Sequence, residues 1–374
     1  MLKGVKLSLM IGPAVPVPVP AEIIEALTSV KVTTASDGPS VFQLQFTVDN
    51  RSPLQTLFLL AGGATPPMVR VIIIATINGQ AEVLIDGVMT NHEFKPAGLG
   101  SNGTLTITGE DLSRVMDYID FSGTPFPAMS PAARVLLILA KYAFLGVIPM
   151  VIPTVLIDVP IPVDRIPRQQ GKDLAYIKQL ANEVGYVFYV EPQRPGTSLA
   201  YWGPEIKVGA PQPALNGDMD AHSNIESIDF SFDSESKVLP VVLIHNQATK
   251  VPIPIPIPDI TPLNPPLGAV PPIPKKVEPI ADTAKRTPIS AALIGLTKAA
   301  RTADAVSATG SLDVLRYGRV LKARRLVGLR GVGEAFNGLY FVKRVTHHIK
   351  RGEYKQDFTL SRNGLISTLP RVPA

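Results

Sequence analysis

The sequence predicts an α+β fold that is mainly β, with two β units separated by a small α/β insertion. Three observations indicate this. Apolar and polar residues alternate near both ends of the chain, helix caps are concentrated in the middle, and β character returns after residue 224. Hydrophobic residues make up 45% of the 374 residues and charged residues 18%, so most of the chain has enough apolar residues to fold.

The first β unit is predicted at residues 1–110. Residues 42–48 and 104–108 alternate apolar with polar side chains, as a strand with one buried face does. Asn78-Gly79 lies between two apolar runs and is typical of a tight hairpin turn. Residues 52–63 predict a short helix, with a serine cap, proline at the first position and two glycines at its end.

Helical signals define an α/β insertion at residues 111–222. Ser130-Pro131 predicts the start of a helix through residue 142, since a serine cap followed by proline suits a helix N-terminus. Residues 172–183 carry apolar side chains at helical spacing and stop before Gly185. We expect strands at residues 186–190 and around Tyr201-Trp202.

The second β unit is predicted at residues 223–246 plus 309–374. Residues 228–232 alternate, and residues 238–245 predict a buried strand. The closing stretch, residues 312–365, predicts a strand, a Gly-rich turn, a long strand, a short charged turn and a final strand.

A Pro-rich extended segment and a helix, residues 247–308, are predicted as an insertion in the second unit. Residues 252–274 contain ten prolines. Such a run lacks amide donors, cannot join a central strand and favours polyproline II, here lying along a protein surface because of its isoleucines and leucines. A helix of small residues is expected at residues 289–308.

The two units also share a local pattern. Residues 90–92, a Gly-bearing loop and residues 104–107 resemble residues 346–348, a charged loop and residues 358–360. The pattern is short, but it favours a duplicated β unit.

Composition excludes several classes of protein. Zero cysteines exclude disulfides and thiolate metal sites, and a net charge of +5 does not by itself imply a nucleic-acid partner. Residues 135–157 are apolar, but Lys141, Pro149 and Pro153 interrupt them, so we expect a buried helix followed by a buried extended segment and no membrane insertion. Prolines between residues 13 and 20 oppose a secretory leader.

No catalytic or metal-binding constellation stands out, and we predict neither enzymatic activity nor a cofactor. His347 and His348 are adjacent on a predicted strand and point to opposite faces, while His92, His222 and His245 lack ligand spacing. Residues 328–333 resemble a phosphate loop but are followed by a strand, so turn glycines explain them better.

Glu110-Asp111 fits a helix start better than acid–base chemistry. A peptidoglycan hydrolase remains the enzymatic alternative.

Basic residues cluster in the closing stretch and predict a stripe along one side of the second unit. Three interpretations of this stripe are open: a solvated face, a contact to acidic partners, or the lining of a lumen. An alternative function, a β-barrel nucleic-acid-binding or pore-lining protein, lacks support from interleaved aromatics or a recognition helix. The candidate lumen or interface residues are Lys322, Arg324, Arg325, Arg330, Lys343 and Arg344, with Lys350 and Arg351 nearby.

Four stretches resemble the late-control D-like, or VgrG-like, baseplate hub proteins of contractile phage tails and injection systems. They are residues 105–117, 171–192, 200–216 and 315–364, and the last is the most specific. The Pro-rich tract is longer than the family pattern leads us to expect. No spike shaft or lysozyme module precedes Ala374, so we expect the spike to be a separate polypeptide.

The resemblance implies two tube-like antiparallel β-barrels joined by the insertion. Three chains would form a homotrimeric ring with pseudo-sixfold symmetry that joins the inner tail tube to the central spike. Implied partners are the tail tube ring, the spike protein and baseplate wedge components, with DNA or effector protein passing through the lumen. Assembly is expected in the cytoplasm, with release as part of the particle.

Overall fold

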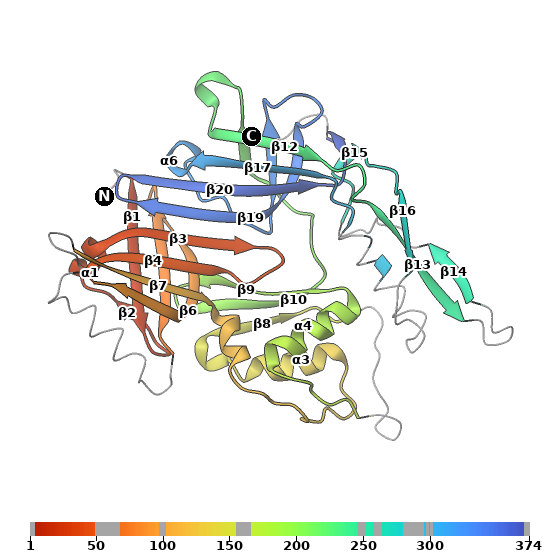
Figure 1. The fold of residues 1–374 in the computed structure, drawn as a ribbon, viewed down its shortest axis with the longest axis horizontal. Coiled ribbons are helices and arrows are strands. Elements are labelled where there is room, and N and C mark those ends of the chain that lie inside the picture. The colour runs from red at the N-terminus through yellow and green to blue at the C-terminus, as the bar shows by residue number, and fades with distance from the viewer. Residues whose placement is uncertain are drawn as a thin grey trace.

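A 13-stranded sheet forms the body of the protein, and a small α/β layer packs beside it (Figure 1). The computed structural model describes residues 4–48, 68–96, 102–154, 166–245, 252–256, 264–279, 295–296, 299 and 302–369. The predicted helix at residues 52–63 lies outside the described residues.

The first unit follows the predicted order of strands. It contains β1 (Val5–Gly12), β2 (Val17–Pro18), α1 (Ala21–Ala26), β3 (Leu27–Ala35), β4 (Val41–Val48), β5 (Arg70–Ile77), β6 (Gln80–Lys95) and β7 (Gly103–Asp111). Asn78 and Gly79 have φ of 50° and 81°, the left-handed conformations that a two-residue turn between β5 and β6 requires.

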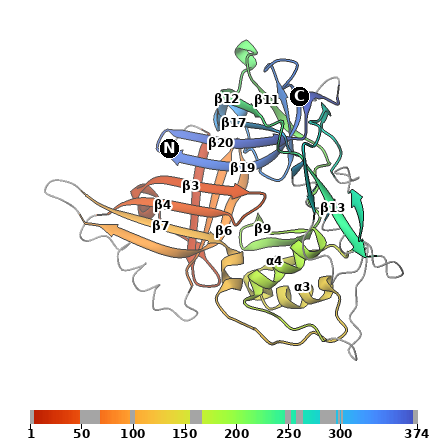
Figure 2. The ribbon, with the colours of Figure 1, turned by 45° about the vertical axis from the view of Figure 1, so that its right-hand side comes forward.

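The insertion is a three-stranded sheet covered by two helices (Figure 2). It contains η1 (Leu112–Asp117), α3 (Pro131–Ala140), η2 (Ala143–Leu145), β8 (Val147–Val151), α4 (Asp173–Val184), β9 (Val187–Arg194) and β10 (Thr197–Gly203). The Ser130 hydroxyl accepts from the Ala133 amide and Gly185 ends α4 with positive φ, so both predicted helix boundaries are confirmed to within two residues.

The second unit contains the three predicted closing strands and a longer excursion. Its elements are β11 (Gln212–Asn216), η3 (Asp220–His222), β12 (Ile225–Phe232), β13 (Val238–His245), β14 (Pro252–Pro256), β15 (Gly268–Val270), β16 (Lys276–Pro279), β17 (Val306–Asp313), α6 (Val314–Tyr317), β18 (Leu326–Arg330), β19 (Gly338–Lys350), β20 (Glu353–Arg362) and β21 (Leu365–Ser367).

The two units have the same strand topology. The first unit has the spatial order β3-β4-β7-β6-β5, and the second has β12-β17-β20-β19-β18. If the five strands of a unit are numbered along the chain, their order in the sheet is first, second, fifth, fourth and third in both units. Every neighbouring pair is antiparallel. The duplication suggested by two short sequence segments therefore extends over five strands.

Two β-bulges give the duplication a residue-by-residue register. The β3–β4 pair has a bulge between Leu27 and Ser29, and the β12–β17 pair has one between Ile225 and Ser227. The β6–β7 and β19–β20 pairs have bulges between Met89 and Asn91 and between Val342 and Arg344. In each unit, the residue pairs across the intervening strands connect one bulge to the other with the same offset. In that alignment Val32 corresponds to Phe230.

The units are not separate bodies, because β19 of the second unit pairs antiparallel with β3 of the first. One apolar core contains Val32 and Leu44 from the first unit and Val345 and Leu360 from the second. Within the described residues the strand path runs from β12 to β2 without closing. The described strands thus show a mainly-β fold of two matching units, whereas closed barrels are not established by the pairing.

The predicted strand at residues 238–245 forms, but it does not pair with the other strands of the second unit's sheet as predicted. β13 pairs with β14 and β16 in a separate three-stranded sheet. Apolar alternation indicates that a strand forms, but it does not select the strand's partner. This sheet extends away from the body on the side opposite the N-terminus (Figure 1).

The Pro-rich tract also differs from the expected polyproline II segment. Residues 252–256 form β14, which pairs with β13 alone among the described strands. Alternate amides of a strand point to the same side, so prolines at every second position can face outward while the isoleucine amides face β13. In the duplicated topology the whole excursion between β12 and β17 replaces the short turn at residues 36–40 between β3 and β4.

Two boundaries need correction. β11 lies within the predicted insertion of residues 111–222, yet it pairs parallel with β18 in the main sheet, with Ala214 and Leu215 buried. The predicted helix at residues 289–308 lies largely outside the described residues, and its end is wrong because β17 begins at Val306. Pairing of β17 with β12 and β20 overrides the helix propensity of these small residues.

The insertion has its own core and a buried ion pair at its base. Trp202, Met116 and Leu139 are fully buried in this core. The Arg70 guanidinium donates two hydrogen bonds of 2.7 Å to Asp86, and the Ser198 hydroxyl of β10 lies 3.4 Å from the same carboxylate. Burial raises the pKa of Asp86 although Arg70 opposes the shift.

Candidate assembly surfaces

Two strand segments of the main sheet have a free side among the described residues. The successive strands β12, β17, β20, β19, β3, β4 and β7 are visible in both views (Figure 1 and Figure 2). β12 pairs only with β17 among the described strands. In β6, pairing with β5 runs as far as Val88, and the Met89 amide then donates to the Val69 carbonyl at 2.8 Å. Among the described strands, residues 91–95 of β6 pair with β7 alone.

The side chains at these two edges are more exposed than the equivalent side chains at the junction of the two units, where β19 pairs with β3. All residues at 90–95 of β6 are exposed, whereas the matching end of β19, where it pairs with β3, alternates buried with half-buried or exposed residues. Phe94 in β6 is 39% exposed, whereas its equivalent His347 in β19 is buried. In the edge strand β12, Phe232 is 40% exposed, while Phe230, the equivalent of the buried Val32, is half-buried against Phe336. Exposed aromatic residues on unpaired strands are typical of a surface that pairs with another chain.

The predicted basic residues do not share one environment. Lys322 reaches from the second unit to the first, with its ammonium 2.6 Å from the Glu82 carboxylate. The Arg324 guanidinium donates to the Ala35 carbonyl at 2.6 Å and lies 4.1 Å from the ring centre of Tyr189. Arg324 therefore connects the second unit to both the first unit and the insertion.

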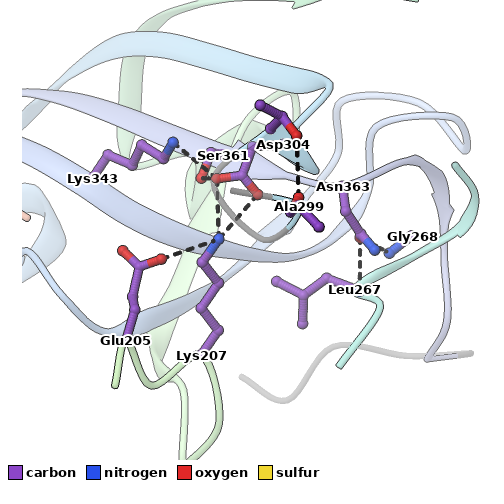
Figure 3. Close-up of polar contacts among 10 residues, drawn as sticks. Glu205, Lys207, Leu267, Gly268, Ala299, Asp304, Lys343, Ser361 and Asn363 are labelled. Atoms are coloured by element: carbon purple, nitrogen blue, oxygen red, sulfur yellow. Dashed lines mark hydrogen bonds and ion pairs between the residues drawn. The ribbon is translucent and has the colours of Figure 1, made fainter. Parts of the chain in front are cut away.

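Lys343 belongs to a buried cluster around Asp304 (Figure 3). The Asp304 carboxylate accepts from Lys207 at 3.1 Å, from Lys343 at 2.9 Å and from the Ser361 hydroxyl at 2.9 Å. Burial opposes ionisation of Asp304, but Lys207 and Lys343 outweigh it and hold the pKa of this carboxyl below its ordinary value. The Glu205 carboxylate lies 3.5 Å from the Lys207 ammonium.

The same region fixes the end of the Pro-rich excursion to the closing strands. The Asn363 side-chain oxygen accepts from the Leu267 and Gly268 amides, each at 2.9 Å (Figure 3). β15 then pairs antiparallel with β21.

Lys322, Arg324 and Lys343 are thus used in contacts within the chain, and Arg330 also has an interaction there. Arg325 and Arg344 are exposed and Arg330 is half-buried. Arg344 lies opposite Ala35 at the junction of the two units. The six residues therefore have different environments within the chain. Sequence reasoning missed Asp304, which pairs with Lys343, because the two lie far apart in the sequence.

The two adjacent histidines point to opposite faces, as expected for a strand. His347 is buried, with its Nδ1 2.9 Å from the Tyr354 hydroxyl and 3.3 Å from the Gln356 amide nitrogen. His348 is half-buried, with its Nε2 2.8 Å from Asp357. Burial lowers the pKa of His347 to about 3, so this ring is neutral near pH 7. Within the described part of the chain, no group of three metal-ligating side chains converges.

Loss of the Lys322–Glu82 ion pair should have little effect on stability. Both side chains are about one-third exposed, and exposed pairs contribute about 0.2–1 kcal/mol. We expect Glu82→Ala to lower the free energy of unfolding by less than about 1 kcal/mol in urea titrations. A loss above about 2 kcal/mol would show that this contact holds the two units together.

Comparison with known proteins identifies the fold. No protein family and no curated protein matches the chain at the sequence level. Among solved structures, a tail protein from Neisseria meningitidis MC58 is 14% identical, with a TM-score of 0.63 and coverage of 97% of this chain and 98% of that one. A 43 kDa tail protein of prophage MuSo2 from Shewanella oneidensis is 12% identical, with a TM-score of 0.60 and coverage of 96% and 98%.

A chain of the Francisella PdpA–VgrG complex is 8% identical, with a TM-score of 0.61, and the match covers all of this chain and 55% of that one. The protein therefore has the fold found in phage tail proteins and in a VgrG complex. Among the helices that are described, none has the length and apolar character needed to cross a membrane.

Proposed function

We propose that the protein is a structural hub of a contractile tail or injection particle. Three copies form a ring, and each copy contributes two tube-like β modules, so the ring offers six similar positions to the tail tube and three to the spike. The observation that supports this proposal most is the duplicated five-strand topology with matching bulges, on a fold shared with tail proteins.

The two faces of such a ring have different partners. The six β modules meet the inner tail tube, and the spike protein lies on the other side. The β13–β14–β16 sheet supplies a separate contact with neighbouring baseplate components, since Val277 is 63% exposed and the sheet lies outside the main body. DNA or effector protein passes through the lumen. We propose no catalytic step for this protein.

Deletion of the gene in the producing strain tests this function. We expect no complete particles by electron microscopy, and we expect a tagged copy to restore them and to co-purify with the tube and spike proteins. A matched test is the same tagged copy carrying Glu82→Ala, which should restore particles equally well. Normal particles in the deletion strain would contradict a hub role, and salt-sensitive binding to duplex DNA would favour the alternative function.

A further inference from the structure

The strand pairing that joins the two units of one chain has an equivalent between two copies of the chain, because the two units share one topology. β3 and β12 occupy the same place in their units, and so do β19 and β6. Within one chain, residues 344–350 of β19 pair with β3. Among the described strands, the corresponding segments, β12 and residues 91–95 of β6, each have a free side. We propose that the free end of β6 in one copy pairs antiparallel with β12 of a second copy.

The bulges fix the register of this contact. Arg344 follows its bulge as Asn91 follows the bulge in β6, so residues 91–95 correspond to residues 344–348. In the same way residues 229–233 correspond to residues 31–35. The internal partners His347↔Val32 and His348↔Lys31 then become Phe94↔Phe230 and Lys95↔Asp229 between copies.

The side chains at these positions are complementary. On the face that is buried at the internal junction, Phe94 meets Phe230 and His92 meets Phe232. Cross-strand aromatic pairs stabilise a sheet, and this contact would cover the exposed rings of Phe94 and Phe232. On the opposite face Lys95 meets Asp229, an opposite-charge pair. Within one chain, the Lys95 ammonium lies 3.5 Å from the exposed Glu93 carboxylate.

A contact that joins two different edges can repeat from copy to copy. Such a head-to-tail interface closes into a ring or continues as a filament, depending on the rotation that it imposes. The closure after three copies rests on the proposed function, whereas the strand pairing and its register rest on the duplicated ladder. The two parts can therefore fail separately.

Paired cysteines provide the test, since the chain has no natural cysteine. Directly opposite residues in an antiparallel pair have Cα atoms roughly 4.5–5.5 Å apart, within reach of a disulfide, while positions shifted by two residues are about 7–8 Å apart. We expect full-length Lys95→Cys/Asp229→Cys to form disulfides between chains under mild oxidation, giving a ladder on non-reducing gels that stops at three chains.

Two matched controls calibrate the measurement. Lys31→Cys/His348→Cys places cysteines at the equivalent internal pair and should give a disulfide within one chain. Glu93→Cys/Asp229→Cys shifts the register by two residues, and we expect at least fivefold less cross-linked product.

The outcomes separate the interface from the hub role. A trimeric mass with no cross-link at residues 95 and 229, while the internal control closes, would overturn the interface and leave the hub role standing. A ladder that continues beyond three chains would support the strand pairing and contradict the threefold ring. A single-chain mass with no cross-link would overturn both.

Charge reversal gives a second readout that needs no cysteine. Asp229→Lys should weaken self-association by about fivefold, because it places like charges opposite each other across the strands. Lys95→Asp/Asp229→Lys should restore the affinity. If the double variant associates more weakly than either single variant, these residues do not face each other.

Discussion

Replacing Asp304 with alanine should destabilise the protein by about 3–5 kcal/mol, since removing one partner of a buried ion pair leaves the other charge uncompensated. The Lys207 side chain is only 3% exposed, and after the change it would retain Glu205 at 3.5 Å as its acidic neighbour. The Ser361 hydroxyl would lose its acceptor as well. Urea or guanidinium unfolding of the full chain would measure the loss.

A double variant distinguishes an unpaired charge from a simple loss of packing. Lys207→Met in the Asp304→Ala background removes the stranded charge, so we expect this double variant to recover part of the lost stability. Glu353→Ala serves as a surface control, because Glu353 pairs with Lys355 where both side chains are substantially exposed, and it should change stability by less than about 1 kcal/mol. A cost below about 1 kcal/mol for Asp304→Ala would contradict the role assigned to the cluster.

Acidification should destabilise the fold through His347. The pKa of this ring is about 3 in the folded protein against 6.5 for the unfolded chain. Between these values the unfolded chain binds a proton that the folded protein excludes, so stability is fully present above about pH 6.5 and falls as the pH drops toward 3. The slope is about 1.4 kcal/mol per pH unit, and the full effect is on the order of 5 kcal/mol.

The comparison with His347→Gln isolates this contribution. Other buried groups also titrate, and Asp86 and Asp111 have raised pKa values that act in the opposite direction as the pH falls. We therefore expect the unfolding free energy of the wild type, relative to that of His347→Gln, to fall by about 2–3 kcal/mol from pH 6.5 to 4.5. His348→Gln, on the other face of the same strand, is the matched control. A difference that does not change with pH would show that His347 is not held neutral by burial.

Local features of the fold could be predicted from the sequence because adjacent residues determine them. The Asn78-Gly79 turn requires left-handed conformations, and Ser130-Pro131 provides a cap before a residue that needs no amide donor. The opposite faces of His347 and His348 follow from the period of a strand.

Pairing between distant strands could not be predicted in the same way. No sequence feature near β13 indicates that this strand leaves the main sheet. Likewise, no sequence feature near β19 indicates that it pairs with β3. The basic residues were visible in the sequence, but their environments depend on Glu82, Ala35 and Asp304, which lie elsewhere in the chain. The exposed aromatics of β6 and β12 became informative only when the duplicated ladder showed that both edges are unpaired.

Axial class averages of the purified full-length protein by electron microscopy would count the chains and β units in the assembly. We expect a closed ring of three chains with six similar lobes around an open centre, because each chain supplies two matching β units. Particles with a different number of lobes, or single chains at the concentrations at which tails assemble, would contradict it.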